Sequence, residues 1–186
     1  MAEDLRDYIL SCEHEDFQKP VSPQRPHTNV FESKFDFLNW PDERVQKFKN
    51  LLFGHLGGMV KMANDIDDAA VNRLRFDNHC WFHITRDGGY FQPHNHPNAS
   101  WSAIYCVDPG DATPVNESAA GHVMFSDPRQ ANSYLDPANR NMRRDLSFNA
   151  VRLRMAPGEI LMFPSYLYHY VEPYIGVRPR ITIAAN

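Results

Sequence analysis

The chain has 186 residues, the length of one domain, and its 42% hydrophobic and 23% charged residues are typical of a globular protein. A formal net charge of −4 favours neither nucleic acid nor an anionic membrane as a partner, and no stretch approaches the roughly 18 apolar residues of a transmembrane helix. Three widely spaced cysteines indicate reduced thiols, and the acidic MAEDLRDYILSC does not resemble a secretory signal, so we expect a cytoplasmic protein.

The first part of the chain, residues 1–71, is expected to form an N-terminal arm and a packing helix. One short helix can form before the prolines that interrupt residues 20–26. The strongest helical pattern covers residues 41–62. It starts at Pro41, carries acidic residues in its first turn and repeats an apolar residue at helical spacing: Val45, Phe48, Leu52, Leu56 and Met59.

The second part, residues 72–186, reads as a β-rich core. Short runs of aromatic and β-branched residues alternate with Gly, Pro, Asn and Asp, which predicts strands at 79–85, 100–107, 122–126, 150–155, 159–164, 168–171 and 180–184. No helical crossover separates them. The pattern therefore predicts one domain over residues 1–186, mainly β with a flanking helix: a double-stranded β-helix, or cupin-like jelly roll, with the 41–62 helix on its outside.

Three histidines and an arginine occupy positions that a jelly-roll metal site requires. His94 and His96 lie in PHNHP just before the 100–107 strand, and residues two apart share one face of an extended chain. His169 lies on a distant strand, and Arg180 follows it by eleven residues on the last one. Imidazole is a good ligand for iron, and a guanidinium binds a carboxylate with two parallel hydrogen bonds.

Residues 76–186 resemble the Fe(II)- and 2-oxoglutarate-dependent dioxygenase superfamily, and most closely a 2OG-Fe(II) oxygenase family of bacterial proteins. The matching stretches are WFH (81–83), HNHP (94–97), SAIYCV (102–107), FSDPR (125–129), GEILMFPSYLYHYVEP (158–173) and RITIAAN (180–186). The resemblance implies a double-stranded β-helix that binds Fe(II) through His94, His96 and His169. It further implies that Arg180 binds the distal carboxylate of 2-oxoglutarate, with Thr182 in the position of the family's serine.

Several positions depart from the superfamily pattern or leave a choice open. His96 stands where most members have Asp or Glu, so a carboxylate from Glu172, Asp108 or Asp127 is an alternative ligand. Arg178 competes with Arg180 for the co-substrate. Tyr105, followed by Cys106, takes the first place of the family's tandem aromatic pair and is expected to contact 2-oxoglutarate. His83 stands where the pattern has Asn.

The expected function is an Fe(II)- and 2-oxoglutarate-dependent oxygenase that hydroxylates a small molecule or an amino-acid side chain, free or in a peptide, and releases succinate and CO2. Two alternatives remain: a cupin-like three-histidine metalloenzyme that does not use 2-oxoglutarate, and a non-catalytic jelly-roll binding protein. The polar segments 108–121 and 127–145 are long enough to select the substrate. The oligomeric state is open, a homodimer included.

Overall fold

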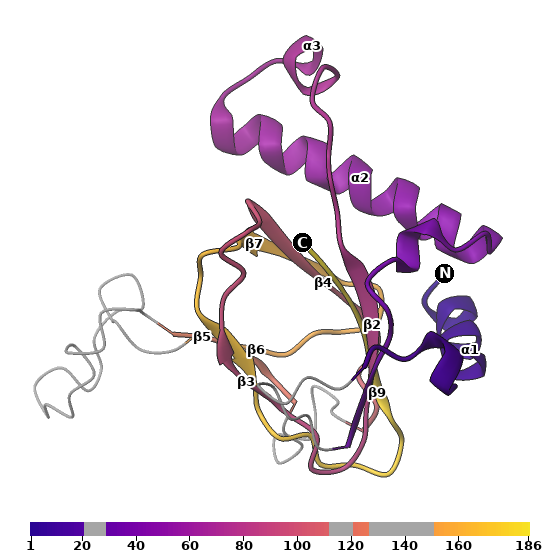
Figure 1. Ribbon diagram of the computed structural model, residues 1–186. Helices are drawn as coiled ribbons and strands as arrows, with labels where there is room; N and C mark the ends of the chain where they lie inside the picture. Colours follow the sequence, from indigo (N-terminus) through magenta and orange to yellow (C-terminus); the bar gives the residue numbers. More distant parts are fainter. Residues whose placement is uncertain (21–28, 112–120, 127–150) are drawn as a thin grey trace, which may run out of the picture.

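The strands of the computed structural model, which describes residues 1–20, 29–111, 121–126 and 151–186, form two sheets (Figure 1). The larger sheet has the order β1-β2-β9-β4-β7 and the smaller has the order β3-β8-β5-β6, with every neighbouring pair antiparallel. The strands are β1 Val30–Glu32, β2 Cys80–Thr85, β3 Phe91–His94, β4 Trp101–Asp108, β5 Val123–Phe125, β6 Val151–Leu153, β7 Ile160–Pro164, β8 His169–Val171 and β9 Arg180–Ala185. This is the expected double-stranded β-helix.

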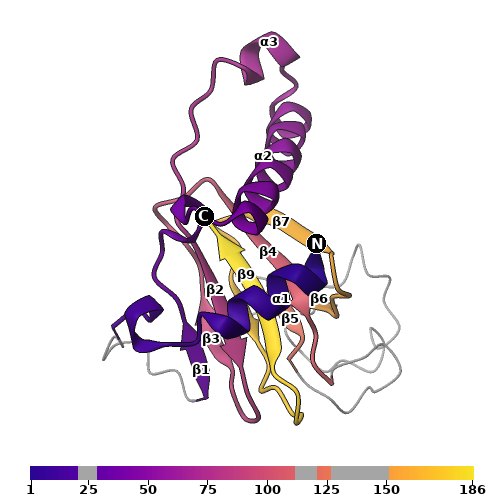
Figure 2. The same ribbon diagram turned by 90° about the vertical axis from the view of Figure 1, so that its right-hand side faces the viewer.

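The helices lie outside the larger sheet (Figure 2). They are α1 Ala2–Ser11, α2 Glu43–Asn64 and α3 Asp68–Val71, with 3-10 turns η1 Glu15–Phe17 and η2 Phe37–Asn39. In Figure 2, α1 crosses the front of β9 and β4, while α2 runs upward from the end of the sheet. Among the described residues, no helix is long and apolar enough to cross a membrane.

The helix expected at residues 41–62 is confirmed as α2, which ends at Asn64, two residues past the predicted end. The side chain of Asp42 caps its first turn by accepting a hydrogen bond from the Arg44 main-chain N–H at 2.9 Å. The helix ends at Asp65, which takes the left-handed conformation. Gly57 and Gly58 do not end it. Each glycine costs an exposed helix about 1 kcal/mol, which burial of the opposite apolar face offsets.

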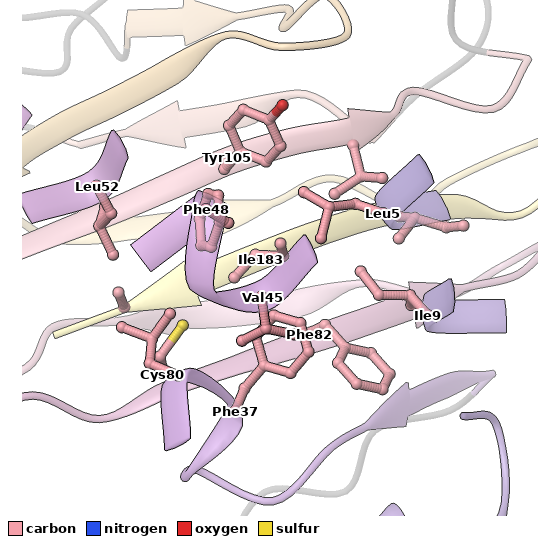
Figure 3. Packing of buried hydrophobic residues seen from close by; sticks show 14 of the residues in the cluster. Leu5, Ile9, Phe37, Val45, Phe48, Leu52, Cys80, Phe82, Tyr105 and Ile183 are labelled. Carbon is pink, nitrogen blue, oxygen red and sulfur yellow. The ribbon is translucent and has the colours of Figure 1, made fainter. Parts of the chain in front are cut away.

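The main core lies between these helices and the outer face of the larger sheet (Figure 3). Alternate residues of β2 and β9, including Phe82, Ile84 and Ile183, point toward the helices. Leu5 and Ile9 of α1 meet them from one side, and the apolar face of α2 meets them from the other. The remaining residues of each strand point into the space between the two sheets, which is where a site can form.

All seven strands predicted from the sequence are present, within one or two residues at each end. Two further strands, β1 and β3, were missed. The first has only three residues, and the second contains Pro93 and lies at the edge of the smaller sheet, where a missing N–H is tolerated. Most of the expected substrate-selecting segments, 112–120 and 127–145, lie outside the described residues.

Candidate metal centre

Three histidines converge at one end of the space between the sheets. His94 ends β3 and lies directly opposite His169, the first residue of β8. His96 lies in the loop that follows β3. The atoms that these three side chains can offer to a metal all lie within 4.8 Å of one another, and no acidic or cysteine side chain of the described residues joins the group.

Main-chain carbonyls set the proton on two of these imidazoles. Nδ1 of His94 donates to the carbonyl of Gln92 at 2.6 Å, and Nδ1 of His169 donates to the carbonyl of Leu167 at 2.9 Å. With the proton on Nδ1, each neutral ring carries its lone pair on Nε2, and Nε2 is one of the two ring nitrogens through which histidine binds metals. Both acceptors are two residues before the histidine, so the local chain itself orients each ring.

Burial favours the neutral form of His169. Desolvation lowers the pKa of this imidazole to about 4, with the nearby His94 acting in the same direction and the Leu167 carbonyl opposing it. At neutral pH the ring therefore needs no deprotonation before it binds a cation.

The loop that carries His96 is held by Ser165, in the turn between β7 and β8. The main-chain N–H of His96 donates to the Ser165 carbonyl at 2.9 Å, and the N–H of Ser165 donates to the Ser100 carbonyl at 3.1 Å. The two buried hydroxyls of Ser102 and Ser165 lie 2.8 Å apart. His96 is therefore positioned by a loop contact and not, as its spacing from His94 predicted, by a strand.

Arg180 and Thr182 line the same small cavity as the three histidines. The cavity has a volume of about 50 Å³, and both side chains enter it from β9. Arg180 is only 4% exposed, and its guanidinium has no hydrogen bond or ion pair with any residue of the described ranges. Desolvation lowers the pKa of Arg180 from its ordinary value. A buried cation without a counter-ion is costly, so this site is suited to an anion.

The choice between the two arginines follows from their surroundings. Arg178 is 58% exposed, and its Nε donates to the Asp111 carboxylate at 3.0 Å. Arg178 does not line the cavity, whereas Arg180 does. The structure therefore brings Arg180, and not Arg178, together with the histidines.

Tyr105 is not brought into the site. Its ring packs against Phe48 of α2 at a centroid distance of 5.0 Å, on the helix-facing side of β4 (Figure 3). The neighbouring Cys106 points the other way and belongs to a smaller buried cluster with Val123 and Met155. The sequence led us to expect that Tyr105 contacts the co-substrate. The structure does not support this contact, because the larger sheet separates the Tyr105 side chain from the cavity.

The carboxylates considered as alternative metal ligands, Glu172 and Asp108, have other hydrogen-bond partners. Glu172 accepts hydrogen bonds from His122 and Arg152 at 2.9 Å each, and Asp108 accepts one from the main-chain N–H of Gly110 at 2.8 Å. Neither belongs to the histidine cluster. Asp127 lies outside the described residues.

His83 forms part of the cavity lining and links the cavity to Glu32 and Lys19, two partly exposed residues of opposite charge. Its Nε2 lies 2.9 Å from Nε1 of Trp81 and 3.0 Å from Oε2 of Glu32, whose other oxygen accepts from Lys19 at 3.1 Å. Burial acts to raise the pKa of Glu32, but the hydrogen bond and charge of His83, together with Lys19, outweigh it and hold the pKa at about 2.

A much larger groove of about 650 Å³ adjoins this cavity. Ser102, Ala103 and Asn186 line both spaces. Part of the groove is apolar and includes Phe53 and Phe76, while amide and hydroxyl side chains, together with Arg75, Asp77 and His79, supply polar lining. Sequence patterns did not indicate this groove, because its lining comes from distant segments.

Residues 79–186 match the model of the family described as "Putative 2OG-Fe(II) oxygenase". The chain belongs to this family. It is a 2-oxoglutarate-dependent dioxygenase by this membership, and the matched range contains all three histidines and Arg180. A search of curated proteins finds no match.

Solved structures with the same fold include three hydroxylases. A prolyl-4-hydroxylase from Pseudomonas putida has a TM-score of 0.56 at 15% identity, and the match covers 100% of this chain and 85% of that one. A prolyl hydroxylase from Trichoplax adhaerens, in complex with a hypoxia-inducible-factor peptide, has a TM-score of 0.57 at 13% identity and coverages of 97% and 75%. A viral collagen prolyl hydroxylase from Paramecium bursaria Chlorella virus-1, in complex with 2OG, has a TM-score of 0.53 at 12% identity and coverages of 96% and 86%.

Proposed function

We propose that the protein is an oxygenase in which His94, His96 and His169 bind Fe(II), and Arg180 and Thr182 bind the distal carboxylate of 2-oxoglutarate. One observation carries the proposal: three clustered imidazoles line the same cavity as a buried guanidinium that has no counter-ion among the described residues. The histidines suit a first-row divalent cation, and the guanidinium suits an anion.

The ligand set and the co-substrate complement one another electrostatically. Three neutral imidazoles leave a bound divalent ion with its full charge, which favours an anionic chelating co-ligand. When bound, Fe(II) and 2-oxoglutarate would supply the oxidative chemistry with O2 as the oxidant: one oxygen atom of O2 enters succinate as CO2 is released, and the other hydroxylates a C–H bond of the substrate. The chain's own residues orient the reactants and exclude water: Arg180 forms a planar fork, and His83 and the apolar residues close the cavity.

The substrate is a small molecule or an amino-acid side chain, free or in a peptide, that approaches from the adjoining groove. A cavity of about 50 Å³ can admit only the reacting group, so the rest of the substrate needs the space of about 650 Å³ next to it. The groove offers Phe53 and Phe76 for apolar contact and amides such as Asn78 and Asn98 for hydrogen bonding. The peptide bound to the Trichoplax hydroxylase supports a substrate of this class.

Anaerobic titration tests the proposal. Fe(II) followed by 2-oxoglutarate should produce the metal-to-ligand charge-transfer absorption of a chelated 2-oxo acid. Arg180→Met should keep the fold and the metal but weaken 2-oxoglutarate binding by at least 30-fold, since a buried carboxylate loses its partner at a cost of roughly 2–5 kcal/mol.

The matched control is Arg178→Met, which removes an exposed arginine two residues away and should bind 2-oxoglutarate as the wild type does. The reverse order of the two variants would show that the arginine is wrongly assigned. Absence of the absorption in the wild type, at full iron occupancy, would argue against 2-oxoglutarate altogether.

A further inference from the structure

The large groove beside the cavity lies in line with β9. This strand runs between β2 and β4, and Cys80 of β2 and Ala103 of β4 are both paired with Ala185 near its end. Because both neighbours are antiparallel to β9, their preceding residues extend past its end, as residues 75–79 and 98–102, and both segments line the groove. The space between them is an open strand position, which no described residue occupies.

The main chain of residues 75–78 offers hydrogen-bonding groups to the open strand position. Figure 1 shows an extended chain between α3 and β2, and no hydrogen bond joins the main chain of residues 75–78 to any described residue. The next residue, His79, exchanges two main-chain hydrogen bonds with Asn186, each of 2.9 Å. Main-chain groups of an extended chain alternate in direction, so Asp77 faces the open strand position and Asn78 faces away from it.

Trp101 offers the corresponding groups from β4. The main-chain N–H of Cys106, on the same strand, donates to the carbonyl of Glu159, just before β7, at 3.0 Å. Trp101 is an odd number of residues from Cys106, so its main-chain groups face the opposite side, toward β9 and the open strand position. An extended segment in that position can therefore pair with Trp101 at one residue and with Asp77 at the next.

The two faces of the open strand position differ in chemistry. Along β9, Thr182 lines the histidine cavity, whereas Ile183 packs under the helices. An extended segment in line with β9 continues this alternation. Its outward side chains meet apolar residues of α2, including Leu52 and Leu56, which also line the groove. Its inward side chains lie on the side of the sheet that carries the three histidines.

A series of contacts connects the open strand position to a metal ligand. The side-chain oxygen of Asn186 accepts from the Ser102 hydroxyl at 2.7 Å, and the hydroxyls of Ser102 and Ser165 are 2.8 Å apart. The Ser165 carbonyl accepts from the main-chain N–H of His96 at 2.9 Å. The open strand position and the metal ligands are therefore at the same end of the larger sheet.

We propose that the open strand position binds the substrate as an extended peptide, which adds a strand to the larger sheet and presents one inward side chain for hydroxylation. Only a repeating amide backbone pairs with Asp77 and Trp101 in turn. The residue next to the hydroxylated one is apolar, because its side chain points outward to Leu52 and Leu56. This inference rests on the proposed function and chooses a peptide over a free small molecule.

Hydrogen exchange in the presence of a peptide library tests the proposal. The protein is loaded with Fe(II) and 2-oxoglutarate in the absence of oxygen, and exchange of individual main-chain amides is followed by mass spectrometry. The probe is a library of random hexapeptides with acetylated and amidated ends. The matched probe is a mixture of N-acetyl amino-acid amides at the same total residue concentration, which carries the same side chains but is too short to span the position.

The library should slow exchange at Asp77 and Trp101 about 5-fold and leave Asn78 unchanged, because only the first two amides face the bound strand. The single amino-acid amides should slow neither. No slowing at Asp77 with the library, or equal slowing with both probes, overturns the proposal. Slow exchange at Asp77 before any peptide is added also overturns it, because a segment of the chain itself would then fill the position.

Two variants of Asp77 separate main-chain pairing from the carboxylate. Asp77→Pro removes both the side-chain charge and the N–H that faces the open strand position, whereas Asp77→Ala removes only the charge. The KM for library-dependent succinate formation should be about 5-fold higher for Asp77→Pro than for Asp77→Ala, with similar kcat, since one hydrogen bond is lost. Thermal unfolding and metal content confirm that both variants fold. Equal KM values in the two folded variants would overturn the pairing role of Asp77.

Anaerobic titration without peptide distinguishes failure of this site from failure of the proposed function. If the charge-transfer absorption forms but the library does not protect Asp77, only the peptide site is overturned. If the absorption does not form at full iron occupancy, the proposed function is overturned, and the peptide substrate with it.

Discussion

Gly121 lies directly against Arg180. A Cβ placed on Gly121 would come within 3.2 Å of Arg180 Cδ, and Gly121 has a positive φ of 91°. Gly121→Ala should therefore both strain the main chain and displace the arginine. We expect a loss of stability of about 1 kcal/mol and several-fold weaker 2-oxoglutarate binding, measured by thermal unfolding and by anaerobic titration.

Gly158→Ala is the matched control for this prediction. Gly158 also has a positive φ, of 85°, but a Cβ there would meet nothing within 4 Å. This variant should show the same loss of stability with unchanged co-substrate binding. Equal binding defects in both variants would mean that contact with Arg180 is not the cause.

Metal analysis of three histidine variants checks the ligand set. His94→Ala and His169→Ala each remove one of three clustered ligands and should lose bound metal. His96→Asp should retain it, because a carboxylate is the usual ligand at this position in the superfamily. Full metal occupancy in His94→Ala would contradict the three-histidine site.

Tyr105→Phe should not affect the co-substrate. The tyrosine ring packs on Phe48 outside the cavity, so removal of its hydroxyl should leave 2-oxoglutarate affinity unchanged and alter the unfolding free energy by less than about 1 kcal/mol. Tyr105→Ala should cost about 3–5 kcal/mol, because it leaves a hole between β4 and α2. A stable Tyr105→Phe protein that no longer binds 2-oxoglutarate would return Tyr105 to the site.

Because the pKa of Glu32 is lowered in the folded protein, we expect the free energy of unfolding to decrease in acid. Its pKa of about 2 lies below the ordinary value of 4.5, so the folded state binds this proton less readily than the unfolded state does. The resulting stabilisation, about 3 kcal/mol, is complete above pH 4.5 and is lost as the pH falls through 2.

The measurement is urea unfolding of the metal-free wild type and of Glu32→Gln at several pH values. The variant should be less stable at pH 6 and should approach the wild type near pH 2. A stability difference that does not change over this range would show that ionisation of Glu32 is not responsible.

Local patterns in the sequence determined most of the architecture. The α2 helix is readable because one face is apolar and Asp42 and Glu43 suit its start. Seven strands are readable because turn residues separate short runs of aromatic and β-branched residues. The order and spacing of His94, His96, His169 and Arg180, taken together with the resemblance to the oxygenase family, predicted four residues that the fold brings into one cavity.

The tertiary structure decided which side of the larger sheet each residue faces. All six residues of β2 are buried, and β4 is covered by helices on one face and by the cavity and inner core on the other. A strand buried on both faces has no alternation of polar and apolar residues, so its inner and outer positions cannot be told apart from sequence. Tyr105 was assigned to the wrong face for this reason. Only the register of β2, β4 and β9 separates the residues that pack under the helices from those that surround the cavity.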